Sequence, residues 1–170
     1  MKTQPIRVGI GYDVHPLAKK RKLILGGVEI EYEKGLAGHS DADVLIHAIC
    51  DALIGAAGEG DIGKWFPDTD PQYHNISSLL LLNKVGKKLL TLGWQILNID
   101  STILAEKPHM AQHIPHMLDN IAENLNLSPS AINIKATTNE GLGFIGRSEG
   151  IATLAISTLQ KTEKNQNPLP

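Results

Sequence analysis

The segment from residue 38 to residue 53 constrains the fold most, because it changes from a loop to a helix with two distinct faces. Ser40 is a favourable N-cap residue, and Asp43 three positions later completes a capping-box pattern. Apolar side chains then repeat at helical spacing, so this helix is predicted to pack on the core. On another face, Asp43, His47 and Asp51 repeat every four residues. A carboxylate one turn from a histidine can orient the imidazole for a metal, but a polar face held by local pairs has the same spacing.

Strands and helices are predicted to alternate along the chain, whose 170 residues suit one domain. This order indicates an α/β or α+β fold with helices on one face of a sheet. The opposite face then needs a cover, and association with further copies of the chain is the simplest one. The sequence patterns place strands at 6–10, 95–105 and 131–137, helices at 40–57, 77–92 and 110–126, and a hairpin at 23–32. Residues 150–160 fit a helix or a strand, and their alternation of small polar and aliphatic residues favours a strand.

The overall composition excludes several classes of function. A net charge of −2 provides no field that would attract nucleic acid. The sequence contains no run of about 18 apolar residues, so no membrane-spanning helix is expected. Without an apolar leader the chain is expected to be cytoplasmic, or else a mature form that has already been trimmed. The single cysteine, Cys50, lies among apolar residues of the first predicted helix and is expected in the core rather than as a nucleophile.

Asp13 and His15 follow the first predicted strand and are separated by one residue. In an extended backbone two such side chains point to the same side, so they can form a two-point metal clamp. A turn with a capping aspartate explains the same pattern equally well.

Two loops between the predicted elements also carry polar side chains. Residues 58–71 contain three glycines, two prolines and three aspartates around Trp65 and Phe66, which are expected to anchor the loop. These aspartates suit a turn, a cation site or a hydroxyl-binding site, and all three interpretations stay open. Residues 137–147 combine hydroxyls, glycines and Arg147, a composition that can cradle a phosphate, although glycine-rich loops are common.

Several short motifs occur in a fixed order along the chain. They are Asp13-Val14-His15, His39-Ser40-Asp41, His47, Gly60-Asp61-Ile62-Gly63, Phe66-Pro67-Asp68-Thr69-Asp70 and Ala136-Thr137-Thr138. Together they resemble the family of 2-C-methyl-D-erythritol 2,4-cyclodiphosphate synthases of the non-mevalonate isoprenoid pathway. The similarity implies one domain at residues 1–160, followed by a polar tail at 161–170. The implied fold is α+β (an α/β sandwich): a mixed four-stranded sheet with helices on one face, a small hairpin, and sheets packed around a trimer axis.

The resemblance also implies two metal sites. Asp13, His15 and His47 match the ligands of a catalytic zinc ion, one per subunit, whose fourth position is open for a substrate phosphate. Glu140 matches a ligand of a second divalent ion, magnesium or manganese, that bridges two phosphates. Asp51, one turn after His47, is the candidate for the residue that orients this imidazole, an expectation based on helix geometry rather than on the family motif.

The reaction implied by the resemblance is intramolecular and needs no protein nucleophile. The 2-phosphate of 4-diphosphocytidyl-2-C-methyl-D-erythritol 2-phosphate attacks the β-phosphorus, which closes a cyclic diphosphate and expels CMP. His39 and Thr138 match family residues that assist this step, and Asp61 matches the residue that holds the erythritol hydroxyls. The positions matched to substrate binding are Asp13, His15, His39, Ser40, Asp61, Ile62, Gly63, Phe66, Pro67, Asp68, Thr69, Asp70, Ala105, Glu106, Lys107, Pro108, His109, Met110, Ala111, Thr137, Thr138, Asn139, Glu140, Phe144 and Arg147.

In the family a neighbouring subunit supplies the cytidine contacts, so the resemblance implies a homotrimer with sites at subunit interfaces. Residues 105–111 match the base-binding loop, and residues 137–140 match the diphosphate contacts. Phe144 and Arg147 match a flexible end of the site. Arg147 with Glu149 is expected near a central cavity for which isoprenoid diphosphates are the proposed ligands.

The sequence departs from the family pattern at a few positions. Ala42 stands where glycine is frequent and is expected to stiffen the turn after Asp41, and Asn139 replaces a more usual threonine or serine. Glu106 and Lys107 replace uncharged residues expected in the base-binding loop. A synthase explains all the motifs. The alternatives are a binding trimer without turnover and a metal-dependent phosphohydrolase, which metal content and product analysis would distinguish.

Overall fold

The structure is a computed structural model that describes residues 4–162. The strands are β1 (Ile6–Lys19), β2 (Leu23–Leu25), β3 (Val28–Ile30), β4 (Lys34–Leu36), β5 (Trp94–Leu104), β6 (Ile132–Thr137) and β7 (Gly150–Lys161). The helices are α1 (Val44–Ala57), α2 (Ile62–Trp65), α3 (Ser78–Thr91), α4 (Ile114–Leu125) and α5 (Gly143–Gly146), with short 3₁₀ helices η1 (Pro71–Tyr73) and η2 (Pro129–Ala131).

Within residues 4–162 the main sheet has five strands in the order β4-β1-β7-β5-β6, and β2 and β3 form a separate hairpin. β1 pairs antiparallel with β7, and β5 is antiparallel to β7 but parallel to β6. This mixed sheet confirms the predicted α+β fold. It has one strand more than the four expected, because the three-residue β4 pairs with the end of β1.

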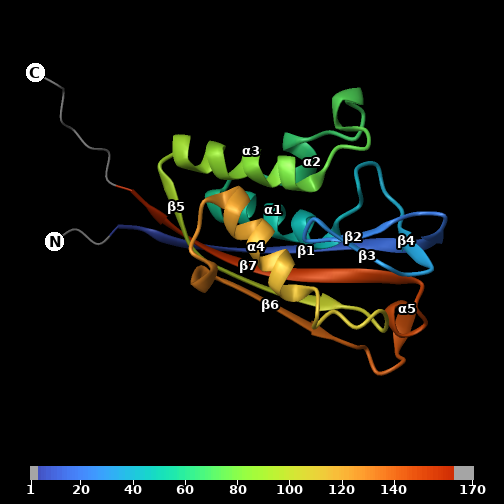
Figure 1. The fold of residues 1–170 in the computed structure, drawn as a ribbon. Helices are drawn as coiled ribbons and strands as arrows, with labels where there is room; N and C mark the ends of the chain where they lie inside the picture. Colours follow the sequence, from blue (N-terminus) through green and yellow to red (C-terminus); the bar gives the residue numbers. More distant parts are fainter. Residues whose placement is uncertain (1–3, 163–170) are drawn as a thin grey trace, which may run out of the picture.

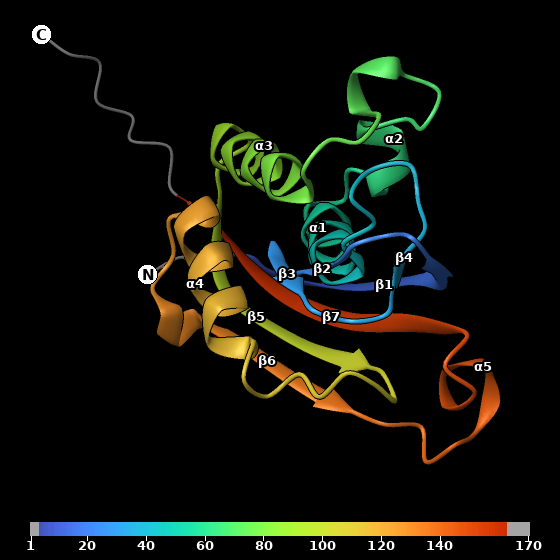
Figure 2. The same cartoon turned by 45° about the vertical axis from the view of Figure 1, so that its right-hand side comes forward.

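The long helices α1, α3 and α4 lie on one face of the sheet (Figure 1, Figure 2). Most side chains of α1 are buried, because this helix lies between the sheet and α3. The helix approaches β1 most closely at Gly9 and Gly11, where an added Cβ atom would lie 2.0 Å from a backbone oxygen of α1. Only glycine fits at these two positions, so they determine how closely α1 packs on the sheet.

The opposite face of the sheet carries no helix among the described residues (Figure 2), and along β1 and β7 it is apolar. Alternate side chains of β1 and β7 are exposed there, with an exposed fraction of 69% for Ile10. A contiguous apolar surface of this kind is typical of a surface that becomes buried by association. The exposed side chains are Ile6, Val8, Ile10, Tyr12, Val14, Leu154 and Ile156.

β1 is longer than the sequence pattern predicted. It continues past residue 10 to Lys19, because β7 pairs with it as far as Pro16 opposite Gly150. Asp13 and His15 therefore lie within a strand and not in a turn after it. The segment at 58–71, expected to be a loop, contains α2 and begins η1, and α4 starts at Ile114 rather than at residue 110.

The start of α1 also differs from the prediction. Ser40 is not the N-cap; Asp43 is, and its Oδ1 atom accepts a 3.1 Å hydrogen bond from the backbone N–H of Ile46. Ala42 has a left-handed φ of 58°, which a right-handed helix cannot contain, so the helix cannot begin before Asp43.

Of the polar tail expected at 161–170, Lys161 belongs to β7, and residues 163–170 lie outside the described part of the chain. Among the helices of the described residues, none has both the length and the apolar character needed to cross a bilayer.

Candidate active site

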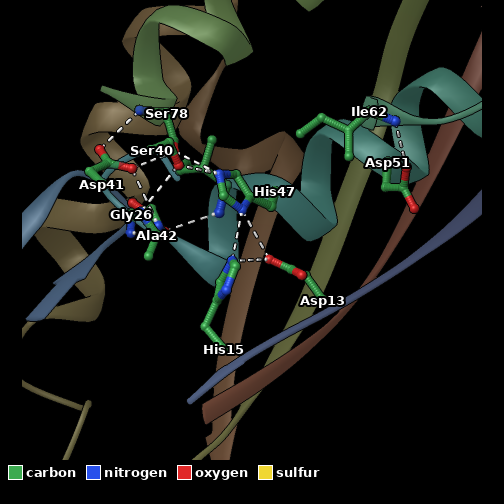
Figure 3. A network of polar contacts seen from close by, with 12 residues as sticks. Asp13, His15, Gly26, Ser40, Asp41, Ala42, His47, Asp51, Ile62 and Ser78 are labelled. Atoms are coloured by element: carbon green, nitrogen blue, oxygen red, sulfur yellow. Dashed lines mark hydrogen bonds and ion pairs between the residues drawn. The ribbon is translucent and has the colours of Figure 1, made fainter. Parts of the chain in front are cut away.

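Three potential metal ligands meet between β1 and α1 (Figure 3). Asp13 and His15 point from β1 to the same side, since residues two apart in a strand share one side. The Oδ2 atom of Asp13 lies 3.0 Å from Nε2 of His15 and 3.0 Å from Nδ1 of His47, and these two nitrogens are 3.2 Å apart. The three side chains predicted as the metal ligands are thus brought together in one cluster.

The donor set of this cluster fits a divalent metal ion. Two imidazole nitrogens and one carboxylate oxygen are a common catalytic zinc set, in which a fourth position stays open. With bonds of about 2.0 Å, tetrahedral ligand atoms are about 3.3 Å apart. The 3.0–3.2 Å separations between the ligand atoms here are close to that value. The geometry therefore fits a divalent metal ion.

Asp13 and His47 shift each other's pKa. Burial by itself would raise the pKa of Asp13, but hydrogen bonds from His15 and His47 outweigh it and hold this pKa well below its usual value of 3.8. Burial would lower the pKa of His47, whereas the carboxylate of Asp13 raises it above 6.5. Because a metal ion binds the deprotonated imidazole, this raised pKa makes protonation of His47 compete with metal binding.

The other ring nitrogen of His47, Nε2, faces two hydroxyl groups (Figure 3). It lies 2.9 Å from Oγ of Ser78 and 3.1 Å from Oγ of Ser40. Ser78 in turn donates its own proton to Oδ1 of Asp41, at 2.5 Å. The imidazole is thus held on both sides, by the potential metal ligands on one and by a hydroxyl–carboxylate pair on the other.

Asp51 does not orient His47, and the predicted role of this residue was wrong. Its side chain points away from the imidazole (Figure 3) and accepts a 2.9 Å hydrogen bond from the backbone N–H of Ile62. Asp51 therefore fastens the start of α2 to α1. The physical reason is that other elements already supply the groups around both ring nitrogens of His47: β1 does so at Nδ1, and the hydroxyls of Ser40 and Ser78 do so at Nε2.

A pocket opens beside the three ligands and has one polar and one apolar wall. The apolar wall comes from the segment after α2 and from α3, and the rings of Phe66 and Tyr73 meet there edge to face with centroids 5.4 Å apart. The predicted site residues that line the pocket are Asp13, His15, His39, Ser40, His47, Asp51, Ile62, Gly63, Phe66 and Asp68. Sequence reasoning missed Tyr12, Tyr73, Ile76 and Leu81, because apolar residues that line a pocket have the same pattern as core residues.

Other predicted residues of this segment have structural contacts of their own. Asp61 is the N-cap of α2 and accepts a 2.8 Å hydrogen bond from the backbone N–H of Lys64. Asp70 caps η1 in the same way, with a 3.0 Å hydrogen bond from the backbone N–H of Gln72. Like Pro67 and Thr69, these two aspartates are not among the residues that line the pocket.

The residues matched to base and phosphate recognition form a second group. None of the described residues 105–111 or 137–147 lines the pocket of the metal ligands. At the far end of this group Phe144 is exposed, and Arg147 pairs with Glu149 through a 2.8 Å contact. One chain therefore presents two separate groups of predicted site residues.

Glu106 joins the two loops of this second group. Its Oε1 atom accepts hydrogen bonds from the backbone N–H groups of Asn139 (2.8 Å) and Gly141 (3.4 Å). Within the second loop, the Thr138 hydroxyl donates a 3.0 Å hydrogen bond to Oε1 of Glu140. The departure at position 106 thus provides an acceptor that ties the predicted base-binding loop to the predicted phosphate-binding loop.

An α+β domain with two histidines and a carboxylate beside an open pocket points to the class of metal-binding enzymes. A family model described as the YgbB family matches residues 6–160. Curated relatives named 2-C-methyl-D-erythritol 2,4-cyclodiphosphate synthase are 60% identical in Clostridium beijerinckii, over 91% of this chain and 98% of the relative, and 56% identical in Thiobacillus denitrificans, over 92% and 98%. The chain belongs to the YgbB family.

Solved structures agree with this assignment. The bifunctional IspDF from Campylobacter jejuni is similar with a TM-score of 0.89 and 44% identity, over 93% of this chain and 43% of that one. A CDP complex of IspF from Plasmodium falciparum is similar with a TM-score of 0.82 and 31% identity, over 94% of this chain and 99% of that one. The family and the fold expected from the sequence are confirmed, and the chain is an enzyme of the lyase class.

Proposed function

We propose that this enzyme converts 4-diphosphocytidyl-2-C-methyl-D-erythritol 2-phosphate into 2-C-methyl-D-erythritol 2,4-cyclodiphosphate and CMP in the cytoplasm. The observation that carries the proposal is the convergence of Asp13, His15 and His47 beside a pocket, in a chain 60% identical to a named synthase. A zinc ion on these three residues would act as a Lewis acid toward the β-phosphate oxygens.

The residues of the chain position the substrate and do not react with it covalently. His39, on the pocket wall, would neutralise charge on the attacking 2-phosphate, with Ser40 beside it. Asp61 and the segment 62–70 would hold the erythritol hydroxyls. Holding the phosphate and the phosphorus in reach of each other supplies much of the catalysis, because the reaction is intramolecular.

The second group of residues would bind the nucleotide part of the substrate. The loop at 105–111 would contact cytosine, and residues 137–140 would contact the diphosphate. Thr138 would stabilise the leaving group, and Glu140 would hold a magnesium or manganese ion, which would offset the negative charge of the phosphates. Two similar solved structures are CDP-bound forms, which supports a cytidine nucleotide as the ligand.

The active assembly in this proposal is a homotrimer with its sites at subunit interfaces. The exposed apolar face of β1 and β7 supports association, and the two groups of site residues in one chain require a neighbouring copy to meet. Phe144 and the Arg147–Glu149 pair would then lie near the central cavity, where an isoprenoid diphosphate is the proposed ligand.

The experiment is to incubate the purified protein with zinc, magnesium and the substrate, and to follow the products by phosphorus NMR. CMP and the cyclic diphosphate should appear together. CMP with a ring-opened phosphate would identify a hydrolase instead. A zinc-loaded trimer that releases no CMP would be a binding protein.

Three variants assign the roles within the site. His47→Ala should lose zinc and turnover but keep the assembly, and full zinc occupancy would show that the ligand set is wrong. Asp61→Ala should weaken substrate binding while zinc stays bound. Thr138→Ala should lower kcat more than affinity, whereas an effect on affinity alone would make Thr138 a binding residue only.

A further inference from the structure

The hydroxyl–carboxylate pair behind His47 is buried and comes from two distant parts of the chain. Ser78, the first residue of α3, has an exposed fraction of 0%. The carboxylate of Asp41 receives both polar groups of Ser78: the backbone N–H at 2.9 Å and the hydroxyl at 2.5 Å. The same hydroxyl oxygen lies 2.9 Å from Nε2 of His47. Figure 3 shows these side chains in line, on the side of the imidazole away from Asp13.

The direction of each hydrogen bond in this line follows from the number of protons. A serine hydroxyl has one proton, and an ionised carboxylate can only accept. Since Ser78 gives its proton to Asp41, its oxygen can only accept from His47. Nε2 of His47 must therefore carry a hydrogen, and in the neutral ring Nδ1 is left with its lone pair. That lone pair faces Oδ2 of Asp13 and Nε2 of His15, where a cation is needed.

Ser40 alone could not impose this tautomer. Its oxygen accepts a 3.2 Å hydrogen bond from the backbone N–H of Ala42, and its own proton is free to turn toward Nε2 of His47 or toward Ser78. Ser78 removes the ambiguity because its proton is committed to Asp41.

We infer that Asp41 and Ser78 are positioning residues for the metal site: they fix His47 in the orientation and tautomer in which Nδ1 binds the metal. This inference rests on the metal centre of the proposed function and adds two residues to it. It also makes the packing of α3 against α1 part of the metal site, because Ser78 begins α3. Outer hydrogen-bond partners of metal-binding histidines are worth about 10–100-fold in metal affinity.

The test compares two neighbouring serines. Ser78→Ala removes the hydroxyl that faces His47, and Ser77→Ala is the matched control, because Ser77 is the N-cap of α3 and makes no side-chain capping bond in the described structure. Zinc affinity is measured by competition with a chromogenic chelator. We expect Ser78→Ala to bind zinc about 10–100-fold more weakly than wild type, Ser77→Ala to match wild type, and Ser78→Thr, which keeps the hydroxyl, to recover most of the affinity.

Asp41→Asn tests the direction of the hydrogen bonds. The backbone N–H of Ser78 can only donate, so the amide oxygen of the new side chain must face it and the amide NH₂ must face the hydroxyl. The Ser78 proton would then turn toward Nε2 of His47 and favour the wrong tautomer. Asp41→Asn should therefore lower zinc affinity at least as much as Ser78→Ala.

Nitrogen-15 histidine NMR of the zinc-loaded wild-type protein gives a readout that needs no variant. The expected spectrum has the proton of His47 on Nε2 and the metal on Nδ1, and the reverse arrangement would overturn the inference. Equal zinc affinity of Ser78→Ala and Ser77→Ala would overturn it as well. If the wild-type protein took up no zinc, the metal centre of the proposed function would fail and this inference with it.

Discussion

Gly11→Ala tests whether the close contact between α1 and β1 determines both the stability of the fold and the zinc affinity of the metal site. A Cβ atom at residue 11 would lie 2.0 Å from the backbone oxygen of Ala48 and 2.7 Å from the backbone nitrogen of Ala52. A Cβ atom in ordinary contact lies about 3.5 Å from a neighbouring heavy atom, so α1 would have to move away from β1 by about 1.5 Å. Both obstructing atoms are backbone atoms, so no side chain can simply rotate aside. We expect a loss of about 3 kcal/mol, the upper part of the usual range for overpacking.

The same displacement should weaken the metal site, because its ligands lie on both sides of this contact. His47 is on α1, and Asp13 and His15 are on β1. A constellation of ligands tolerates errors of only about 0.5 Å, so a movement of about 1.5 Å should also lower zinc affinity. The assays are equilibrium urea unfolding in chelator at fixed protein concentration, and zinc competition in buffer.

Gly55→Ala is the matched control for this substitution. Gly55 is an exposed residue of the same helix, and an added Cβ atom would meet only the backbone oxygen of Ile10, at 3.9 Å. Replacing a helical glycine by alanine should stabilise the protein by about 1 kcal/mol and leave zinc binding unchanged. A Gly11→Ala protein as stable as Gly55→Ala, with normal zinc affinity, would refute the reasoning.

Three further predictions concern pH, Asp51 and Glu106. The pKa of His47 is raised above 6.5 in the metal-free fold, so its contribution to the free energy of unfolding is fully present below pH 6.5 and is lost as the pH rises through the folded pKa. Zinc needs the deprotonated ring and should reverse this trend. Urea unfolding as a function of pH, with and without zinc, measures both slopes. Asp51→Ala should free the start of α2 and raise the substrate KM about fivefold, which corresponds to the loss of one hydrogen bond. Zinc affinity should not change. A loss of zinc would show that Asp51 does orient His47. Glu106→Ala should raise the KM for the cytidine substrate by a similar factor. Glu106→Gln keeps a hydrogen-bond acceptor for the loop at 139–141 and should bind the substrate normally. Equal KM values for the two variants would exclude a role of the hydrogen bonds between the two loops.

The metal ligands could be predicted from the sequence because local geometry carries most of the information. Two residues separated by one position share a side of any strand, so Asp13 and His15 form a pair wherever β1 runs. A histidine on the polar side of a neighbouring helix is then a reasonable third ligand, and the family resemblance identified it as His47. The structure confirms that these three side chains meet.

The partners of His47 could not be predicted in the same way. Asp41 and Ser78 are separated by 37 positions and meet only because α3 packs against α1 with its first turn over the loop before α1. The spacing of Asp51 suggested a partner, but spacing does not show that the backbone N–H of Ile62 takes up its carboxylate. Tertiary packing decides both points, and the residue spacings of a single sequence carry no signal for it.

Metal binding and turnover should depend differently on assembly, because the metal ligands and the predicted nucleotide-binding residues lie in separate parts of the chain. All three metal ligands, and the hydrogen bonds behind His47, lie within one chain and on elements fixed by a buried helix and a paired strand. The residues proposed to bind the nucleotide belong to other loops. Within residues 4–162, none of these residues lines the pocket beside the metal ligands. On the proposed assembly a separated subunit therefore keeps its metal but lacks the other half of its substrate site. Zinc affinity should be independent of protein concentration, whereas specific activity should fall on dilution below the concentration at which the copies associate.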